Sequence, residues 1–153
     1  MKSPNELFEA DDSTALLCIE NESIRSVVTD QLKSLGFKMQ SGLFREDVAL
    51  RLQTHAYDLL VVSDGFEQGE GESNRIVMDC CESSPEHRRS LFLALIGPDF
   101  VSEDGMQAFR HSVDLVVATA DVGRLAPMLR RSLDEHEDRY RRFRECAERA
   151  IMM

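Results

Sequence analysis

The run Leu59–Val62 constrains the fold more than any other stretch of this 153-residue chain. It holds four consecutive apolar residues, two of them β-branched, which indicates a strand buried on both faces of a sheet. Ser63, Asp64 and Gly65 follow directly. Because ligands gather at the carboxyl ends of central strands in an open α/β sheet, we expect any chemistry of the protein at this point.

Four more apolar segments alternate along the chain with segments of helical period. Each crossover is long enough for parallel strand pairing, which predicts an α/β fold with a doubly wound five-stranded parallel sheet and helices on both faces. The other strands are predicted at Thr14–Ile19, Phe37–Leu43, Leu91–Ile96 and Leu115–Ala118, and the helical stripes between them at Ile24–Leu35, Val48–Ala56, Ile76–Cys81 and Met106–Val113.

Local signals predict where some helices begin and end. Asn21 and Ser102 are expected to be the N-caps of the first and fourth helices, because their side chains accept hydrogen bonds from the first free amides. Gly36 is expected to end the first helix. The fourth helix should present one apolar face, made of Met106, Phe109 and Val113.

The composition excludes several classes of function. The formal net charge of −10 disfavours nonspecific binding to nucleic acid and to anionic membranes, since both carry the same sign. No apolar run approaches the ~20 residues of a membrane span, and the polar N-terminus lacks the apolar core of a secretory signal. The cysteines, with no framework spacing, are Cys18, Cys80, Cys81 and Cys146. We therefore expect a cytoplasmic protein.

From Thr14 to about Leu133 the sequence resembles the receiver domain of bacterial response regulators, in a degenerate (pseudo-receiver) form. The resemblance rests on element order, on the segment Tyr57–Val62 as the family's third strand, and on Glu70-Gly71 where the family usually has Asp-Gly. It implies phosphoryl transfer from a histidine kinase to an aspartate. That chemistry needs Mg²⁺ held by acids, together with a Thr/Ser and a Lys that contact the phosphoryl group.

The residues that carry this chemistry are largely missing here. The acceptor position falls on Ser63, and the acidic pair after the first strand falls on Ile19 and Glu20, so that one metal-binding acid is absent. The Thr/Ser position falls on Ile96, or on Gly97 in a register shifted by one, and the lysine position falls on Ala118. The resemblance thus implies a phosphoacceptor region without its acceptor, hydroxyl and lysine.

Asp64 offers an alternative acceptor, with Glu20 holding Mg²⁺. It stands one residue along the strand, where the side chain points to the opposite face, so a bulge would be needed to aim it correctly. We favour an acidic solvated loop. No other cofactor and no metal site is predicted: the loop Glu20–Ser23 would repel phosphate, and the histidines and cysteines form no ligand pattern.

The last segment differs in charge from the rest, because eight arginines against seven acids follow from Asp121 onward. Apolar and aromatic residues recur there with the four-three spacing of a heptad seam, which predicts a long helix beyond the domain. Pro127 is tolerable only near its first turns. The helix could fold back on its own domain, but we favour a homodimer, and the candidate interface residues are Leu129, Leu133, His136, Tyr140, Phe143 and Ala147.

The predicted organisation is a flexible tail at 1–12, a receiver-like domain at 13–134 and a helical extension at 135–153. We predict a non-catalytic signalling and protein-interaction module that dimerises through its last helix and is not phosphorylated at the usual site. The alternative is an atypical receiver that uses Asp64 with Mg²⁺. The signalling partner cannot be named from the sequence.

Overall fold

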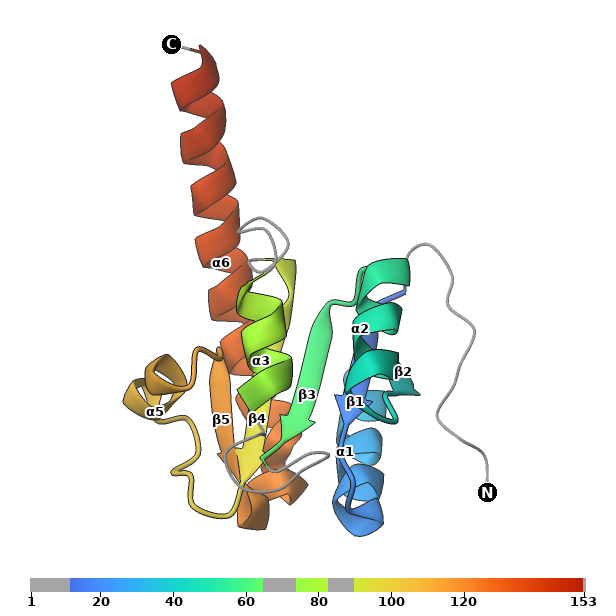
Figure 1. Cartoon of the computed structure of the whole chain (residues 1–153). Helices are drawn as coiled ribbons and strands as arrows, with labels where there is room; N and C mark the ends of the chain where they lie inside the picture. The colour runs from blue at the N-terminus through green and yellow to red at the C-terminus, as the bar shows by residue number, and fades with distance from the viewer. Residues whose placement is uncertain (1–11, 65–73, 83–89, 153) are drawn as a thin grey trace.

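The computed structural model of the protein describes residues 12–64, 74–82 and 90–152. Five parallel strands form one sheet in the order β2-β1-β3-β4-β5, as Figure 1 shows. This confirms the predicted doubly wound parallel sheet. The expected tail before Asp12 and the acidic loop that contains Glu70-Gly71 lie outside the described residues.

The central strand β3 (Leu59–Ser63) pairs with β1 (Thr14–Cys18) on one side and with β4 (Phe92–Gly97) on the other. The outer strands are β2 (Lys38–Ser41) and β5 (Leu115–Ala118). All four residues of Leu59–Val62 are at most 1% exposed, as expected for a strand covered on both faces.

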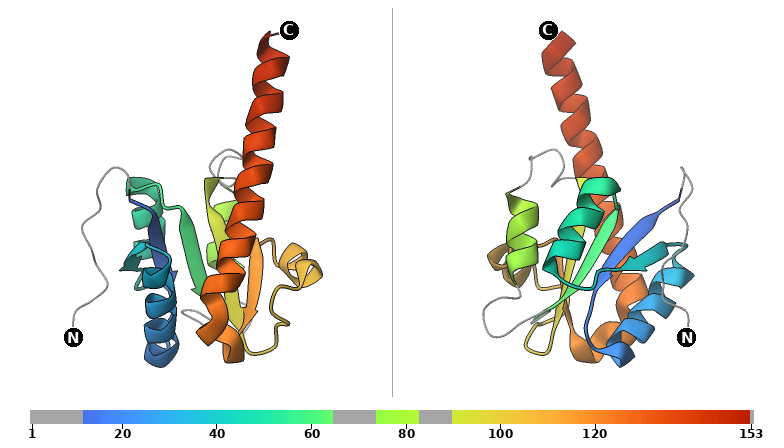
Figure 2. Two further views of the ribbon diagram at one scale, coloured as in Figure 1. Left: turned by 180° about the vertical axis from the view of Figure 1, so that it is seen from behind. Right: turned by 45° about the vertical axis from the view of Figure 1, so that its right-hand side comes forward.

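Helices cover both faces of the sheet (Figure 2). On one face, α1 (Glu22–Ser34) and α6 (Leu125–Met152) bury Val28, Leu32, Leu125 and Leu129 in one apolar cluster. On the other face, a second cluster includes residues from helices α2 (Arg45–Thr54), α3 (Asn74–Cys81) and α5 (Gly105–Arg110). Apolar burial on both faces is what a doubly wound sheet requires for stability.

The first helix begins and ends as the sequence predicts. Asn21 Oδ1 accepts a hydrogen bond from the Ile24 amide at 3.1 Å, so Asn21 is the N-cap of α1. Gly36 follows the helix with φ of +87°, a left-handed conformation that glycine adopts without a steric cost.

The start of α5 differs from the prediction. Asp104, not Ser102, is the N-cap: its Oδ1 accepts hydrogen bonds from the amides of Met106 at 2.9 Å and Gln107 at 3.2 Å. Both residues are good caps by type, and the sequence alone does not decide between them. The Ser102 hydroxyl is instead held elsewhere, at the carboxyl edge of the sheet.

The prediction of an apolar face on α5 is also wrong. Met106 and Phe109 are 62% and 81% exposed, whereas Ala108 and Val113 are buried. The helix already ends at Arg110, and Ser112 takes a φ of +59° in a turn whose Val113 amide donates to the Ala108 carbonyl at 3.0 Å. This terminating turn brings Val113 back to the sheet, so it does not belong to the helical stripe.

The last helix is continuous and longer than the domain. A 3₁₀ turn, η1 (Thr119–Arg124), leads into α6, and Pro127 is tolerated because it lies in the first turn. The 28 residues of α6 span about 42 Å. It runs antiparallel to the strands, passes the amino edge of the sheet and projects beyond the body (Figures 1 and 2). Within the described part of the chain, no helix is both long and apolar enough to cross a bilayer.

Candidate functional site

The carboxyl ends of β1, β3, β4 and β5 bring together the positions that the sequence analysis singled out. Cys18 pairs with Val62, Ser63 with Ile96, and Gly97 with Ala118, so these strand ends are level with one another. The edge thus has the shape of a receiver site. Its chemistry depends on the groups that these strand ends present.

The face of this edge that α1 and α6 cover is apolar. Ile19 is 2% exposed and Ile96 is 1% exposed, and both belong to the apolar cluster beneath α1 and α6. Between them, the Ser63 hydroxyl donates a long hydrogen bond of 3.3 Å to the Cys18 carbonyl. No carboxylate stands at these three positions, and two of them carry aliphatic side chains, which neither ligate a cation nor stabilise a phosphoryl group.

Asp64 lies on the opposite face from Ser63. A Cβ atom placed on Gly97 would lie 3.1 Å from Asp64 Cβ and 2.8 Å from Phe100 Cε2, and Phe100 packs against the second apolar cluster. The Asp64 amide donates to the Ile96 carbonyl at 2.6 Å, which continues the regular ladder. The exposed carboxylate therefore lies on the other face of the strand from the Ser63 hydroxyl.

A side-chain bridge occupies the end of β5 at the lysine position. The Ala118 amide donates to Ser102 Oγ at 2.8 Å, and Ser102 Oγ donates to Asp121 Oδ2 at 2.6 Å. This hydrogen bond, with the ion pair to Arg124, holds the pKa of Asp121 below its usual range. The sequence analysis missed this bridge, because Ser102 and Asp121 are 19 positions apart and only the fold joins them.

Arg25 is a second residue that the sequence analysis did not single out. It lies on α1, four residues after the cap, and its Nη1 donates to the Ile19 carbonyl at 2.9 Å. A cation therefore lies at the end of β1. It binds a main-chain carbonyl, which fixes α1 to the strand that it follows.

The donor set at this edge does not fit a magnesium site. Mg²⁺ prefers near-octahedral oxygen ligands that include carboxylates, and Glu20 is the only acid of the expected pair. Across residues 12–64, 74–82 and 90–152, no three His, Cys, Asp or Glu side chains gather in a way that could hold a metal ion.

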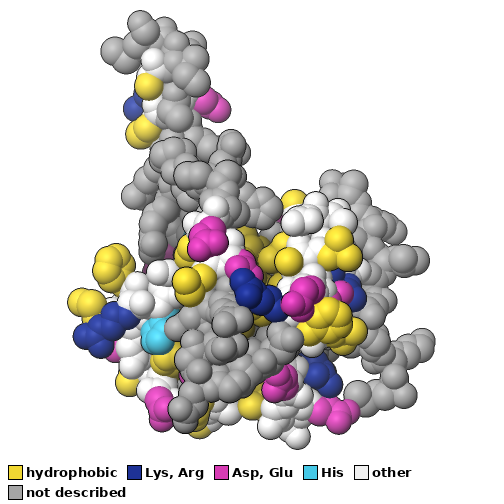
Figure 3. Space-filling view, viewed as in Figure 1, with side chains coloured by type: hydrophobic (Ala, Val, Ile, Leu, Met, Phe, Trp, Pro, Cys, Tyr) yellow, Lys and Arg dark blue, Asp and Glu magenta, His cyan; other side chains and the backbone are white. Residues whose placement is uncertain are grey.

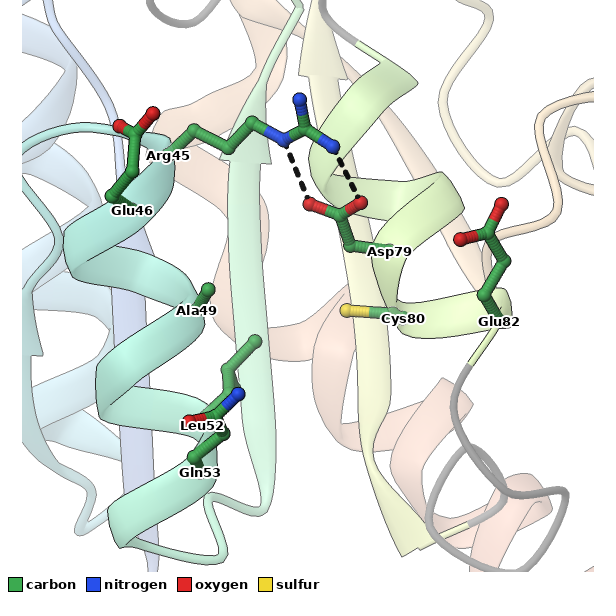
Figure 4. A pocket seen from close by; sticks show the side chains of 8 residues that line it. All are labelled: Arg45, Glu46, Ala49, Leu52, Gln53, Asp79, Cys80 and Glu82. Atoms are coloured by element: carbon green, nitrogen blue, oxygen red, sulfur yellow. Dashed lines mark hydrogen bonds and ion pairs between the residues drawn. The ribbon is translucent and has the colours of Figure 1, made fainter.

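The protein also has a cavity of about 690 Å³ between α2 and α3, away from the strand ends (Figure 4). Arg45 bridges its mouth to Asp79 through two hydrogen bonds, of 2.9 and 2.8 Å. In Figure 3, hydrophobic side chains and charges of both signs surround the region over these two helices. The ion pair joins α2 to α3 across the mouth of the cavity.

The candidate dimer residues divide between the body and the projecting half of α6. Leu129 is fully buried, Leu133 packs against the same cluster, and the ring of His136 lies edge-on against Phe92 at 5.4 Å. His136 Nδ1 is also 3.8 Å from Asp114 Oδ1. The remaining candidates, which follow His136 in the projecting half of α6, are Tyr140, Phe143 and Ala147.

In sequence, no family model and no curated protein matches the chain. Among solved structures it resembles NtrX from Brucella abortus in complex with ADP, at 15% identity and a TM-score of 0.67 over 90% of this chain. The match spans only 29% of NtrX. HP1043, an orphan response regulator of H. pylori, matches at 20% identity and a TM-score of 0.59, covering 78% of this chain and 95% of that one.

A third similar structure contains a trimeric coiled coil of yeast Spc42 fused to another structure. It matches at 13% identity and a TM-score of 0.68, over 94% of this chain and 95% of the fusion. Taken with the strand order, these likenesses define the class of fold. The chain has the receiver fold of response regulators, as its resemblance in sequence implied.

Proposed function

We propose that this protein is a non-catalytic signalling module that keeps the receiver fold without phosphorylation at the usual site. It acts by binding other proteins, and it pairs with a second copy through the projecting half of α6. The signalling role is carried over from the response regulators whose fold it shares.

The observation that carries the proposal is the apolar carboxyl edge. Receiver chemistry places charged or hydroxyl groups where this chain has Ile19, Ile96 and Ala118, and the two isoleucines are buried in the core. Burying aliphatic groups there stabilises the fold, while a phosphoryl group next to them would lack the cations that neutralise its charge. The edge is therefore suited to stability rather than to phosphoryl transfer.

Intact mass spectrometry tests the missing chemistry. The protein is incubated with acetyl phosphate and Mg²⁺, and a receiver protein of known activity serves as the positive control. We expect no added phosphoryl group. A gain of one phosphoryl that disappears in the Asp64→Asn variant would replace the proposal with the alternative, an atypical receiver that uses the exposed Asp64.

Pairing through α6 is supported by its length and its sequence. The helix continues for 16 residues after His136, whose ring lies against Phe92 of the body, and Glu145, Cys146 and Glu148 in this part are exposed. Its heptad spacing continues at Tyr140, Phe143 and Ala147. Because a lone helix with an aromatic stripe would leave apolar area in water, a partner helix stabilises it.

Truncation after Asp138 tests the pairing, since it removes the projecting half and retains the His136 contact with the body. We expect the truncated protein to unfold at nearly the same denaturant concentration as the full chain and to sediment as a monomer. The full chain should sediment as a concentration-dependent dimer. A monomeric full chain, or a dimer that survives truncation, would refute this part of the proposal.

A further inference from the structure

We infer that the two α6 helices pair antiparallel, with the tip of each helix at the amino edge of the partner's sheet. The inference rests on the proposed pairing and adds its orientation. It follows from which side of α6 the body occupies, from the length of the projecting half and from the charge along it.

The predicted seam and the body lie on the same side of α6. Leu129 and Leu133 pack into the core of their own domain and His136 lies against Phe92, so the first half of the seam is covered by the protomer itself. The seam continues along the helix with a drift of only about 20° per heptad. The partner helix must therefore approach from the side on which the body lies.

A parallel pair meets a steric conflict in that arrangement. Both bodies would lie at the same end of the pair and on its inner side, between helices whose axes are about 8–10 Å apart. Each body is a sheet with helices on both faces, and layers of this kind are about 10 Å apart. Two such bodies do not fit between the helices. An antiparallel pair places them at opposite ends, where they do not meet.

The seam has one antiparallel register that uses all of its projecting positions. Heptad spacing beyond His136 falls on Tyr140, Phe143, Ala147 and Ala150. In that register Tyr140 is level with the partner's Ala150, and Phe143 is level with the partner's Ala147. The register thus pairs each aromatic position with a small one, a combination of volumes that suits close approach of two helices.

The length of α6 matches this register. The last helical residue, Met152, comes level with the partner's Asp138, two positions beyond His136, whose ring lies against Phe92 of the body. A register shifted by one heptad would place Ala150 level with Leu133, a site that the body already covers. The projecting half is therefore long enough to reach the partner's body without overlapping it.

Charge along the helix favours the same orientation. The segment 139–144 contains four arginines and no acid, whereas 146–151 contains one glutamate and one arginine. A parallel pair would place the two arginine-rich turns level with each other. The antiparallel register places each of them beside the neutral segment of the partner, where Glu148 provides a carboxylate, so repulsion between like charges is reduced.

Distances between spin labels distinguish the two orientations. In a Cys81→Ser background, Cys146 is the one exposed cysteine, because Cys18 and Cys80 are buried. A label at Cys146 lies near the centre of the antiparallel pair, two positions from level with its copy. A second variant carries Glu137→Cys with Cys146→Ser, and its label lies on an exposed residue outside the seam.

The two orientations give different distances at position 137. The antiparallel register separates the two labels by 16 residues, or about 24 Å along the axis, whereas a parallel pair holds them near the 8–10 Å spacing of the axes. We expect dipolar coupling at Cys146 and a distance of about 24 Å or more at 137. Short distances at both sites would overturn the antiparallel arrangement and leave the pairing intact. No coupling at either site would overturn the pairing and the inference with it.

Discussion

The two ends of the sheet differ in how they use polar side chains. At the carboxyl edge, the positions where receiver chemistry needs an acid, a hydroxyl and a lysine hold Ile19, Ile96 and Ala118, and a side-chain bridge of Ser102 and Asp121 holds the end of β5. At the amino edge, Asp58 accepts from the Thr14 amide and Asp114 accepts from the Leu93 amide, each at 2.9 Å. The second carboxylate also faces α6. At the amino edge, where the long helix leaves the body (Figure 1), carboxylates thus accept directly from strand amides.

The carboxylates at the amino edge have a structural role rather than a catalytic one. A carboxylate that satisfies a strand amide has a structural role, because an unmade hydrogen bond at a buried amide is costly. Asp114 also approaches α6, because its Oδ1 lies 3.8 Å from His136 Nδ1. The carboxyl edge keeps the strand arrangement of a receiver, whereas the proposed partner surface lies on α6 beyond the amino edge.

The largest expected effect concerns the attachment of α6. Leu129→Ala removes a fully buried side chain and should lower the free energy of unfolding by about 2–5 kcal/mol. Leu50→Ala, on α2 with a side chain 59% exposed, is the matched control and should change it by less than about 0.5 kcal/mol. Urea denaturation of the two variants checks this. Equal effects would mean that α6 is not packed on the body as described.

A pair of variants compares the two edges directly. Asp114→Ala leaves the Leu93 amide without its side-chain acceptor and should cost about 1–3 kcal/mol. Ser63→Ala removes only the 3.3 Å hydrogen bond to the Cys18 carbonyl and should cost less than about 0.5 kcal/mol. The measurement is again chemical denaturation. A costlier Ser63 variant would reverse the comparison, because it would show a polar group that stabilises the carboxyl edge.

The smallest expected effect is a pH dependence at the end of β5. Hydrogen bonding to Ser102 and the charge of Arg124 lower the pKa of Asp121 in the folded protein. Its stabilising contribution is therefore complete above the unfolded pKa, near 3.9, and is lost as the pH falls through the lower folded pKa. The stability difference between the native protein and Asp121→Asn should shrink between pH 5 and pH 2, roughly the range over which such a carboxyl titrates. A difference that stays constant over this range would contradict the bridge.

The strand-helix order, the buried centre at Leu59–Val62 and the cap at Asn21 could be predicted from the sequence, because each depends on neighbouring residues. The α5 segment could not, since Ser102 and Asp104 are both good caps and only the link to Asp121 decides between them. The alignment of the strand ends could not be predicted either, because it depends on pairing between strands that are far apart in the sequence.

The heptad seam shows the same limit. Leu129, Leu133 and His136 have the spacing of a helix interface, but spacing does not say whether the interface is with the same chain or with another. In the structure these three residues pack on their own domain. The heptad spacing is therefore uniform in the sequence, but in the structure its first three residues are used for packing within the protomer.

Binding of a divalent ion at the carboxyl edge tests the central claim most directly. Manganese is titrated into labelled protein, and the broadening of the amide signals of Glu20, Ser63 and Asp64 is followed by NMR. We expect no saturable broadening at micromolar Mn²⁺, because the edge lacks the second acid and the acceptor carboxylate. Saturable broadening at micromolar concentration that is lost in Asp64→Asn would contradict it and show that a metal site survives.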